Sequence, residues 1–180
     1  GDIRIVDKQR QFINRFDGHD YLDYIGERVE PWTYLKFPYY KSLGWPDGVY
    51  RVGPLGRLNA AERMATPLAQ AEYEVFQQVR GGQVVEGTLY YHYARLIEDL
   101  YAAERVKEIL LDPDVLSTDI QDHRPVTNAE GVGVIEAPRG TLWHHYWVDE
   151  NGRLEKVNLI VATGNNNWAM SKAVDSVAKT

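Results

Sequence analysis

The sequence contains no cysteine, no surplus of basic residues and no long apolar run. Without thiols, no disulfide can form within its 180 residues. Its formal net charge of −6 at pH 7 repels phosphate on average, so nucleic-acid binding is not expected. Because no stretch of about 18 consecutive apolar residues occurs, we expect no membrane span.

Apolar and aromatic residues, in contrast, are abundant. Hydrophobic residues make up 44% of the chain, which also has five Trp and 12 Tyr. This composition can furnish the core of one domain over residues 1–180, and core packing is the commonest use of Trp and Tyr. Helical and strand-like spacings both occur, so the expected fold class is α+β, with several α-helices packed against a small antiparallel sheet.

Three segments have the apolar spacing of α-helices. Thr66 and Pro67 form an N-cap and first-turn pair, and the helix that they begin is expected to end at Arg80. A last helix begins at Trp168. The longest helix spans residues 89–110 and carries an apolar stripe at three- or four-residue spacing, made of Leu89, Tyr93, Leu96, Leu100, Ala103 and Val106.

The first third of the chain gives weaker signals. Residues 3–6 alternate as in a short strand, residues 21–29 fit a short helix or an irregular turn, and residues 32–37 have the composition of a strand. Residues 53–57 are too rich in Gly and Pro for a regular element, and Asn59 has the character of a helix N-cap.

Residues 131–167 form the stretch around which the rest of the chain is expected to be organised. Two β-rich segments, 141–148 and 153–161, are separated by a turn that contains Asn151 and Gly152. Asn-Gly supplies the positive φ angles of a tight reversal, so this stretch predicts a β-hairpin over residues 141–161.

A break in the β structure is expected just before this hairpin, because Pro138 cannot donate to a strand ladder and Gly140 permits close approach. Arg139 would therefore project from a rigid corner. Two interpretations of that corner stay open: a guanidinium that points into a dry cavity, where its charge and five donors act strongly, or a surface turn with a solvated Arg.

Other charged and imidazole side chains receive structural interpretations. Arg51 and Arg57 are interpreted as solvated or structural ion pairs without a catalytic role. His92 is interpreted as a packing residue or a buried hydrogen-bonding residue. His144 and His145 are adjacent in a strand and point to opposite faces, so they cannot chelate one ion.

Five segments together resemble the large subunit of nickel-iron hydrogenases, most closely the cytoplasmic, NAD(P)-linked bidirectional type. The main one contains Glu-Ala-Pro-Arg-Gly-Thr-Leu, and the five lie at residues 50–59, 90–98, 133–144, 148–152 and 158–164. The resemblance covers most of the chain. It implies that the sequence is part of a larger large-subunit fold.

The resemblance implies roles for residues at and near the 138–140 break. Arg139 would contact a diatomic ligand of the iron and help to polarise or deprotonate hydrogen, and Pro138 would fix its position. Leu142 would keep the gas-accessible side of the site apolar. Ala162 and Thr163 would hydrogen-bond a cyanide ligand through main chain and hydroxyl.

Two further positions are implied more weakly. His144 shares the orientation of Leu142 along the strand, which makes it a candidate for a hydrogen bond near the site. The carbonyl of Leu159 matches a position that binds a third, hard metal ion in the family, although one carbonyl is a weak ligand alone.

The absence of cysteine departs from the family pattern, in which two Cys-x-x-Cys pairs bind nickel and iron. Nothing in the chain replaces four thiolates. We therefore interpret residues 1–180 as an internal fragment that provides scaffold and pocket residues, while the parent binds a nickel-iron centre with CO and cyanide ligands. The fragment itself is expected to bind no metal and to be inactive.

The resemblance also implies partners. The parent would oxidise hydrogen reversibly in the cytoplasm, together with a diaphorase module and an iron-sulfur small subunit that lead electrons to NAD(P). Aromatic residues exposed in the fragment would promote self-association. The alternative hypothesis is a non-enzymatic α+β assembly or binding module that kept the fold and lost the metal.

Overall fold

A computed structural model describes residues 2–123 and 128–180, and the fold is α+β, as the sequence predicts. Within this described part, three antiparallel sheets and five α-helices form. The strands are β1 (Asp2–Val6), β2 (Phe12–Asp17), β3 (Ile25–Val29), β4 (Lys36–Tyr40), β5 (Glu130–Ala137), β6 (Gly140–Val148) and β7 (Leu154–Ile160). The α-helices are α1 (Tyr21–Tyr24), α2 (Pro54–Ala60), α3 (Pro67–Arg80), α4 (Tyr90–Leu110) and α5 (Asn167–Ala178).

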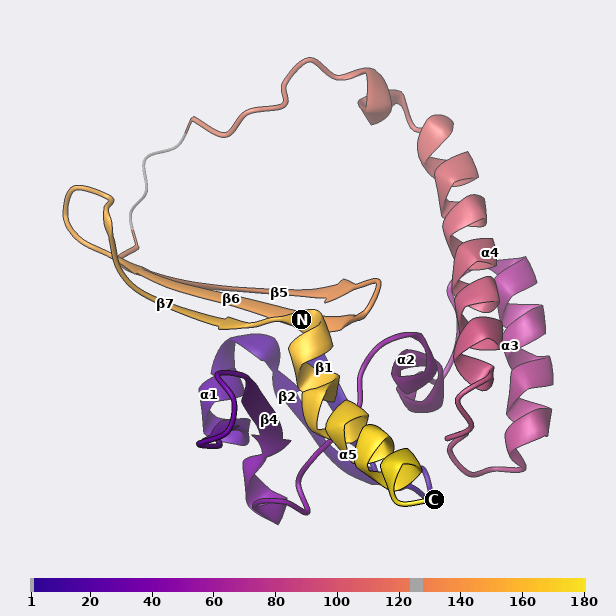
Figure 1. Ribbon diagram of the computed structural model, residues 1–180. Coiled ribbons are helices and arrows are strands. Elements are labelled where there is room, and N and C mark those ends of the chain that lie inside the picture. The colour runs from indigo at the N-terminus through magenta and orange to yellow at the C-terminus, as the bar shows by residue number, and fades with distance from the viewer. Residues whose placement is uncertain (1, 124–127) are drawn as a thin grey trace.

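The sheet β5–β6–β7 extends across the small sheets β1–β2 and β3–β4, while α3 and α4 lie side by side at one end of the molecule with α2 between them and the sheets (Figure 1). Four short 3-10 helices complete the described part: η1 (Gly18–Asp20), η2 (Lys41–Leu43), η3 (Pro113–Leu116) and η4 (Ala162–Asn166). The polar segment after α4 includes residues 124–127, which lie outside the described residues.

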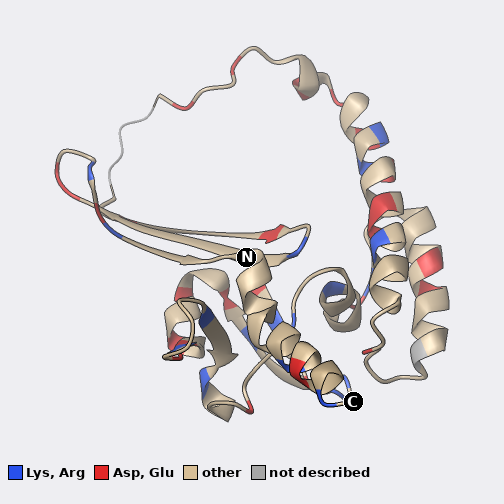
Figure 2. Ribbon diagram, viewed as in Figure 1, with Lys and Arg blue, Asp and Glu red and all other residues tan. Residues whose placement is uncertain are grey.

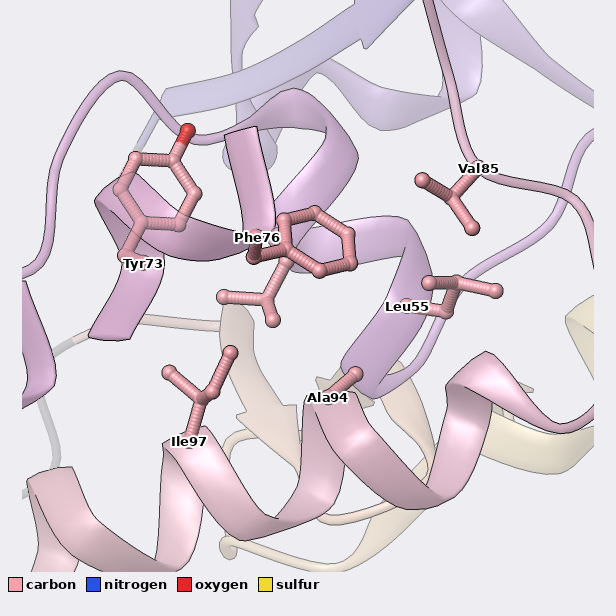
Figure 3. Packing of buried hydrophobic residues seen from close by; sticks show 7 residues of the cluster. Leu55, Tyr73, Phe76, Val85, Ala94 and Ile97 are labelled. Carbon is pink, nitrogen blue, oxygen red and sulfur yellow. The ribbon is translucent and has the colours of Figure 1, made fainter. Parts of the chain in front are cut away.

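Two apolar clusters hold these parts together. The first joins α2, α3 and α4 (Figure 3) and consists of Leu55, Leu58, Tyr73, Phe76, Val85, Ala94 and Ile97. The second lies beneath the large sheet and consists of Phe16, Tyr21, Ile25, Tyr40, Trp143 and Ile160. Each fully buried large side chain stabilises the fold by roughly 1.5–3 kcal/mol, so each half of the molecule has its own core.

The three predicted helices are confirmed. α3 begins at Pro67 and ends before Gly81, whose φ of 55° is left-handed. The predicted buried stripe of α4 is wrong, however, because Leu89 and Leu96 are 80% and 65% exposed whereas Ala94 and Ile97 are buried. The small Ala94 lets α2 and α3 approach this face, and the second half of α4 projects beyond its neighbours (Figure 1).

Two expectations for the segment before α3 are wrong. Residues 53–57 are not irregular: α2 begins at Pro54, whose missing N–H costs nothing at the first helical position. Asn59 is no N-cap but lies near the end of α2. Its amide group exchanges two hydrogen bonds of 2.9 Å with the backbone of Val85.

The N-terminal strands are close to expectation. β1 contains the predicted residues 3–6, whereas residues 21–29 divide into the short α1 and the strand β3. The strand expected at 32–37 lies instead at Lys36–Tyr40 and includes Pro38. β4 pairs only with β3 over most of its length, and such an edge position tolerates a residue without an N–H.

The hairpin predicted over residues 141–161 is confirmed by the antiparallel pairing of β6 with β7. Gly152 has the positive φ (75°). Asp149 closes the turn: its Oδ1 accepts hydrogen bonds of 2.8 Å from the backbone N–H groups of Asn151 and Arg153.

These contacts make the turn sensitive to acid. The hydrogen bond from the Arg153 backbone is the main cause that lowers the pKa of Asp149 below its ordinary value of 3.8. A depressed pKa means that the turn is stabilised above about pH 4 and loses this contribution as the pH falls through the folded-state pKa. In an NMR titration of the side-chain carboxyl carbon, we expect Asp149 to titrate at lower pH in the folded chain than in a peptide of residues 147–155. Equal midpoints would contradict the turn structure.

Candidate functional site

The corner at Pro138 and Arg139 is the turn of a β-hairpin. β5 and β6 pair without interruption up to Ala137 and Gly140, so the expected break is a two-residue reversal within a continuous ladder. Gly140 has a φ of 135°, and a Cβ on it would lie 2.1 Å from Cγ2 of Val52. Glycine therefore allows the turn to pack against the segment before α2.

A hollow of about 530 Å³ lies beside this turn. Five of the six predicted pocket residues line it together: Pro138, Arg139, Leu142, Ala162 and Thr163. The other lining residues are Ala137 and Val161, so the wall combines the β5–β6 turn, the start of β6 and the start of η4. The lining is mainly apolar, with one fixed cation and one hydroxyl.

Arg139 lies at the rim of this hollow. Its side chain is exposed, and it makes no ion pair or hydrogen bond with any residue in the described part of the chain. Within these 180 residues, the guanidinium is therefore open to solvent and not enclosed in a dry cavity. The point from which the Arg139 side chain projects is set by the backbone of the β5–β6 turn.

His144 is the one predicted pocket residue that the structure places elsewhere. It is half-buried on the outer face of β6, where Nδ1 lies 2.6 Å from the hydroxyl of Tyr146. It lines a second hollow with Gly131, Gly133 and Tyr146. Leu159 lies opposite His144 on β7, outside the first hollow.

His145 points to the other face, as predicted. It is 2% exposed, stacks on Trp147 at 3.5 Å and contacts the Tyr21 hydroxyl at 3.1 Å and Glu130 at 2.8 Å. The interpretation of His92 is wrong, since that side chain is exposed on α4, where Nδ1 lies 3.4 Å from Nη1 of Arg95.

Arg57 makes the ion pairs expected from the sequence, but its contacts with the turn at Pro138 and Arg139 were not predicted. Its Nε and Nη2 donate to both carboxylate oxygens of Glu98, at 2.6 and 2.7 Å. Nη1 donates to Glu136 at 2.9 Å and to the carbonyl of Ala137 at 2.8 Å, and Nη2 reaches the carbonyl of Pro138 at 3.2 Å. The predicted ion pairs are confirmed, but they also hold the turn that carries Arg139.

The charges around Arg57 favour its cationic form. Burial alone would lower the pKa of this guanidinium, but its hydrogen bonds to Glu98 and Glu136 outweigh burial and raise the pKa. Glu136 in turn accepts a hydrogen bond from the Thr141 hydroxyl. Arg51, the other basic residue of this segment, is exposed and makes no ion pair in the described part of the chain.

Asn165, also missed, fixes the opposite wall of the hollow. The side chain is 1% exposed, and Nδ2 donates to the carbonyls of Thr141 at 2.9 Å and Ala162 at 3.2 Å. Its Oδ1 accepts a hydrogen bond of 2.6 Å from the Tyr50 hydroxyl. Burial raises the pKa of Tyr50, so the phenol stays neutral as a donor. No sequence signal distinguishes Asn165 from its neighbours Asn166 and Asn167.

The structure offers no complete metal site of its own. No group of three His, Asp, Glu or Cys side chains suited to an ion occurs in residues 2–123 and 128–180. Among the same residues, no helix combines the length and apolarity needed to cross a bilayer. Three aromatic side chains are largely exposed to solvent: Phe12, Trp32 and Tyr34.

Comparisons with known proteins give consistent results. Residues 7–176 match the family model of nickel-dependent hydrogenases. The chain is 50% identical to the NAD-reducing hydrogenase HoxS subunit beta of Cupriavidus necator, over 99% of this chain and 37% of that protein. It is 47% identical to an F420-non-reducing hydrogenase chain of Methanothermobacter marburgensis, over 99% of this chain and 38% of that protein.

A solved structure is similar over nearly the whole chain. It is the H2-reduced crystal structure of an NAD+-reducing [NiFe]-hydrogenase, with a TM-score of 0.87 and 44% identity. The match covers 95% of this chain and 38% of that one. The chain therefore spans less than two fifths of the length of these relatives.

Proposed function

The chain belongs to the nickel-dependent hydrogenase family, and we propose that it forms part of a catalytic large subunit, where it walls the nickel-iron centre without ligating it. The observation that carries this proposal is the hollow in which Pro138, Arg139, Leu142, Ala162 and Thr163 meet. These residues come from two separate segments of the chain, and the sequence motifs point to the same five.

The chemistry of the lining fits a pocket for the splitting of hydrogen. When bound, a nickel-iron centre supplies the redox chemistry, with CO and cyanide as the proposed ligands of iron. In the complete large subunit, Leu142 and Ala162 would help to exclude water from the pocket, which would lower the local dielectric and strengthen the field of Arg139. That fixed cation stabilises the negative charge that develops as hydrogen is polarised. The Thr163 hydroxyl is a hydrogen-bond donor for an anionic ligand such as cyanide.

Pro138 limits the backbone freedom of the turn and so the reach of Arg139. His144 has a different proposed role, because it lies outside the hollow: its contact with Tyr146 orients the outer face of β6 next to Leu142. The Leu159 carbonyl remains proposed as one oxygen ligand of a hard metal ion in the complete protein.

We propose that no residue of this chain ligates nickel or iron. The chain has no thiolate, and its described residues hold no cluster of ligating side chains. We propose that residues 1–180 are an internal part of one large-subunit domain and that two Cys-x-x-Cys pairs outside them provide the ligands.

For the complete protein, the proposed activity is the reversible oxidation of hydrogen in the cytoplasm. Electrons would pass through an iron-sulfur small subunit, then through a diaphorase module, to NAD(P). The NAD-reducing names of two similar proteins support this choice of acceptor.

Metal analysis tests whether the nickel and iron ligands lie outside this chain. We expect the purified 180-residue chain to retain far less than one nickel per chain after dialysis, and the complete gene product to hold nickel and iron together. Circular dichroism of the chain before and after dialysis controls for unfolding. Stoichiometric nickel on the chain would contradict the assignment of the ligands. A complete gene product without metal would favour the non-enzymatic module.

A further inference from the structure

We propose that Arg57 is a positioning residue for Arg139: it clamps the β5–β6 turn so that the backbone from which the exposed Arg139 side chain projects has one fixed location. The inference rests on the proposed function of Arg139 and adds that Arg57 holds the turn that carries it. Arg57 does not line the hollow and touches none of the residues proposed to face the metals except through the backbone of Pro138.

The clamp uses the complete hydrogen-bonding capacity of a guanidinium. Five N–H groups are available, and five contacts are made. Two go to Glu98 on α4, one to Glu136 at the end of β5, and two to the carbonyls of Ala137 and Pro138. Both carbonyls belong to the residues directly before Arg139. A lysine has three donors on one nitrogen and cannot reproduce this set.

The turn needs an anchor of this kind. The β5–β6 ladder ends at the pair Ala137 and Gly140, so the carbonyl of Pro138 lies outside it. The Arg139 side chain makes no hydrogen bond or ion pair with the described residues, so the backbone of the turn fixes only the point from which this side chain projects.

The segment before Arg57 also packs against the β5–β6 turn. Gly53 has a φ of 100°, and a Cβ there would lie 3.3 Å from the carbonyl oxygen of Arg139. Val52 lies against Gly140 on the other side of the turn. One short stretch of chain, from Val52 to Arg57, thus contacts the turn at three successive points.

Two carboxylates offset the charge of the guanidinium that holds the turn. Glu98 and Glu136 offset the charge of Arg57, whose side chain is 23% exposed. Figure 2 shows acidic colouring near the end of β5 and basic colouring in the turn itself. The field of Arg57 is therefore largely neutralised by its two carboxylates, and Arg139 is the cation that lines the hollow.

The test uses the complete enzyme with the substitution Arg57→Lys. We expect nickel and iron to stay bound, the kcat for hydrogen oxidation to fall roughly 10- to 100-fold, since a displacement of about 1 Å can cost that much, and the KM for hydrogen to stay unchanged. Amide hydrogen exchange in a peptide covering residues 134–142 should accelerate. Arg51→Lys, the same change on an exposed side chain of the same segment, should alter none of these quantities.

A double-mutant cycle separates positioning from a general structural effect. If Arg57 acts through Arg139, Arg57→Lys should lower kcat less than about twofold in an Arg139→Lys background, because interacting sites are not additive. Losses that multiply, or exchange at residues 134–142 that stays unchanged, would overturn the proposal. Should Arg57→Lys prevent metal loading, Glu98→Gln, which weakens the clamp from α4, provides the same readouts with a smaller expected loss.

The two proposals fail in different ways. Normal turnover in Arg139→Lys would refute the proposed role of Arg139, while the exchange experiment would still decide whether Arg57 holds the turn. Impaired turnover in Arg139→Lys together with unchanged exchange in Arg57→Lys would refute only the clamp.

Discussion

Replacing Arg139 by Lys in the complete enzyme is expected to lower turnover by roughly 30- to 1,000-fold, which corresponds to about 2–4 kcal/mol in the activation barrier, the scale of losing one preorganised donor. Nickel and iron should remain bound, since neither metal is ligated by this side chain. Hydrogen-dependent reduction of the acceptor and metal content, measured on the same preparation, check both statements.

The expectation follows from geometry more than from charge. Lysine keeps the cation but replaces a planar group with a flexible stem and a strongly hydrated point charge. At the rim of the hollow, where the side chain of residue 139 has no hydrogen-bonding partner among the described residues, an ammonium group would retain more water and would lack the planar donor set of a guanidinium. The field at the reacting hydrogen would become weaker and less directed.

Two comparisons make this result interpretable. Arg153→Lys, in the exposed turn between β6 and β7, should leave turnover and metal content unchanged. Pro138→Ala should lower turnover less than Arg139→Lys, because the Arg57 contacts still hold the turn. Full turnover of Arg139→Lys with both metals in place would refute the role of this arginine.

The sequence was informative wherever a structure depends on neighbouring residues. Thr66 with Pro67 at one end and Gly81 at the other define α3, and Asp149 to Gly152 define the β6–β7 turn. The expectation that Pro138, Arg139 and Leu142 share a pocket came instead from the resemblance to the hydrogenase large subunit, and the three residues do line one hollow.

Contacts between distant segments could not be predicted in this way. Arg57 is 41 residues from Glu98 and 79 from Glu136 in sequence, and nothing near it indicates either partner. The same limit applies to α4, whose buried face is decided by the approach of α2 and α3 to Ala94 and not by where its large apolar residues lie. Residues 53–57 were misjudged because composition describes a loop and a short Pro-initiated helix equally well.

Asn165→Asp is expected to have the largest effect on stability, with a loss of roughly 3–5 kcal/mol in the free energy of unfolding at neutral pH, the scale of an uncompensated buried charge. The substitution keeps the shape of the side chain. It replaces the amide N–H donors that face the carbonyls of Thr141 and Ala162 with an oxygen, so that unfavourable oxygen contacts arise in a site that is 1% exposed. Urea denaturation followed by tryptophan fluorescence, which reports on buried Trp143, gives the difference.

The pH dependence distinguishes this mechanism from a simple loss of packing. Burial among carbonyls raises the pKa of the new carboxyl group in the folded state, so the folded chain binds more protons than the unfolded chain. The destabilisation should therefore be smallest near pH 4, about the ordinary pKa of an aspartic acid, and grow as the pH rises through the raised pKa. Asn167→Asp makes the same chemical change at the first residue of α5, where the helix dipole favours negative charge; it removes one long hydrogen bond of 3.5 Å to the Lys36 carbonyl, so its loss should be far smaller than that at position 165. A pH-independent loss, or equal losses at both positions, would show that the Asn165 hydrogen bonds do not hold η4 against β6; the wall formed by Ala162 and Thr163 would then need another explanation.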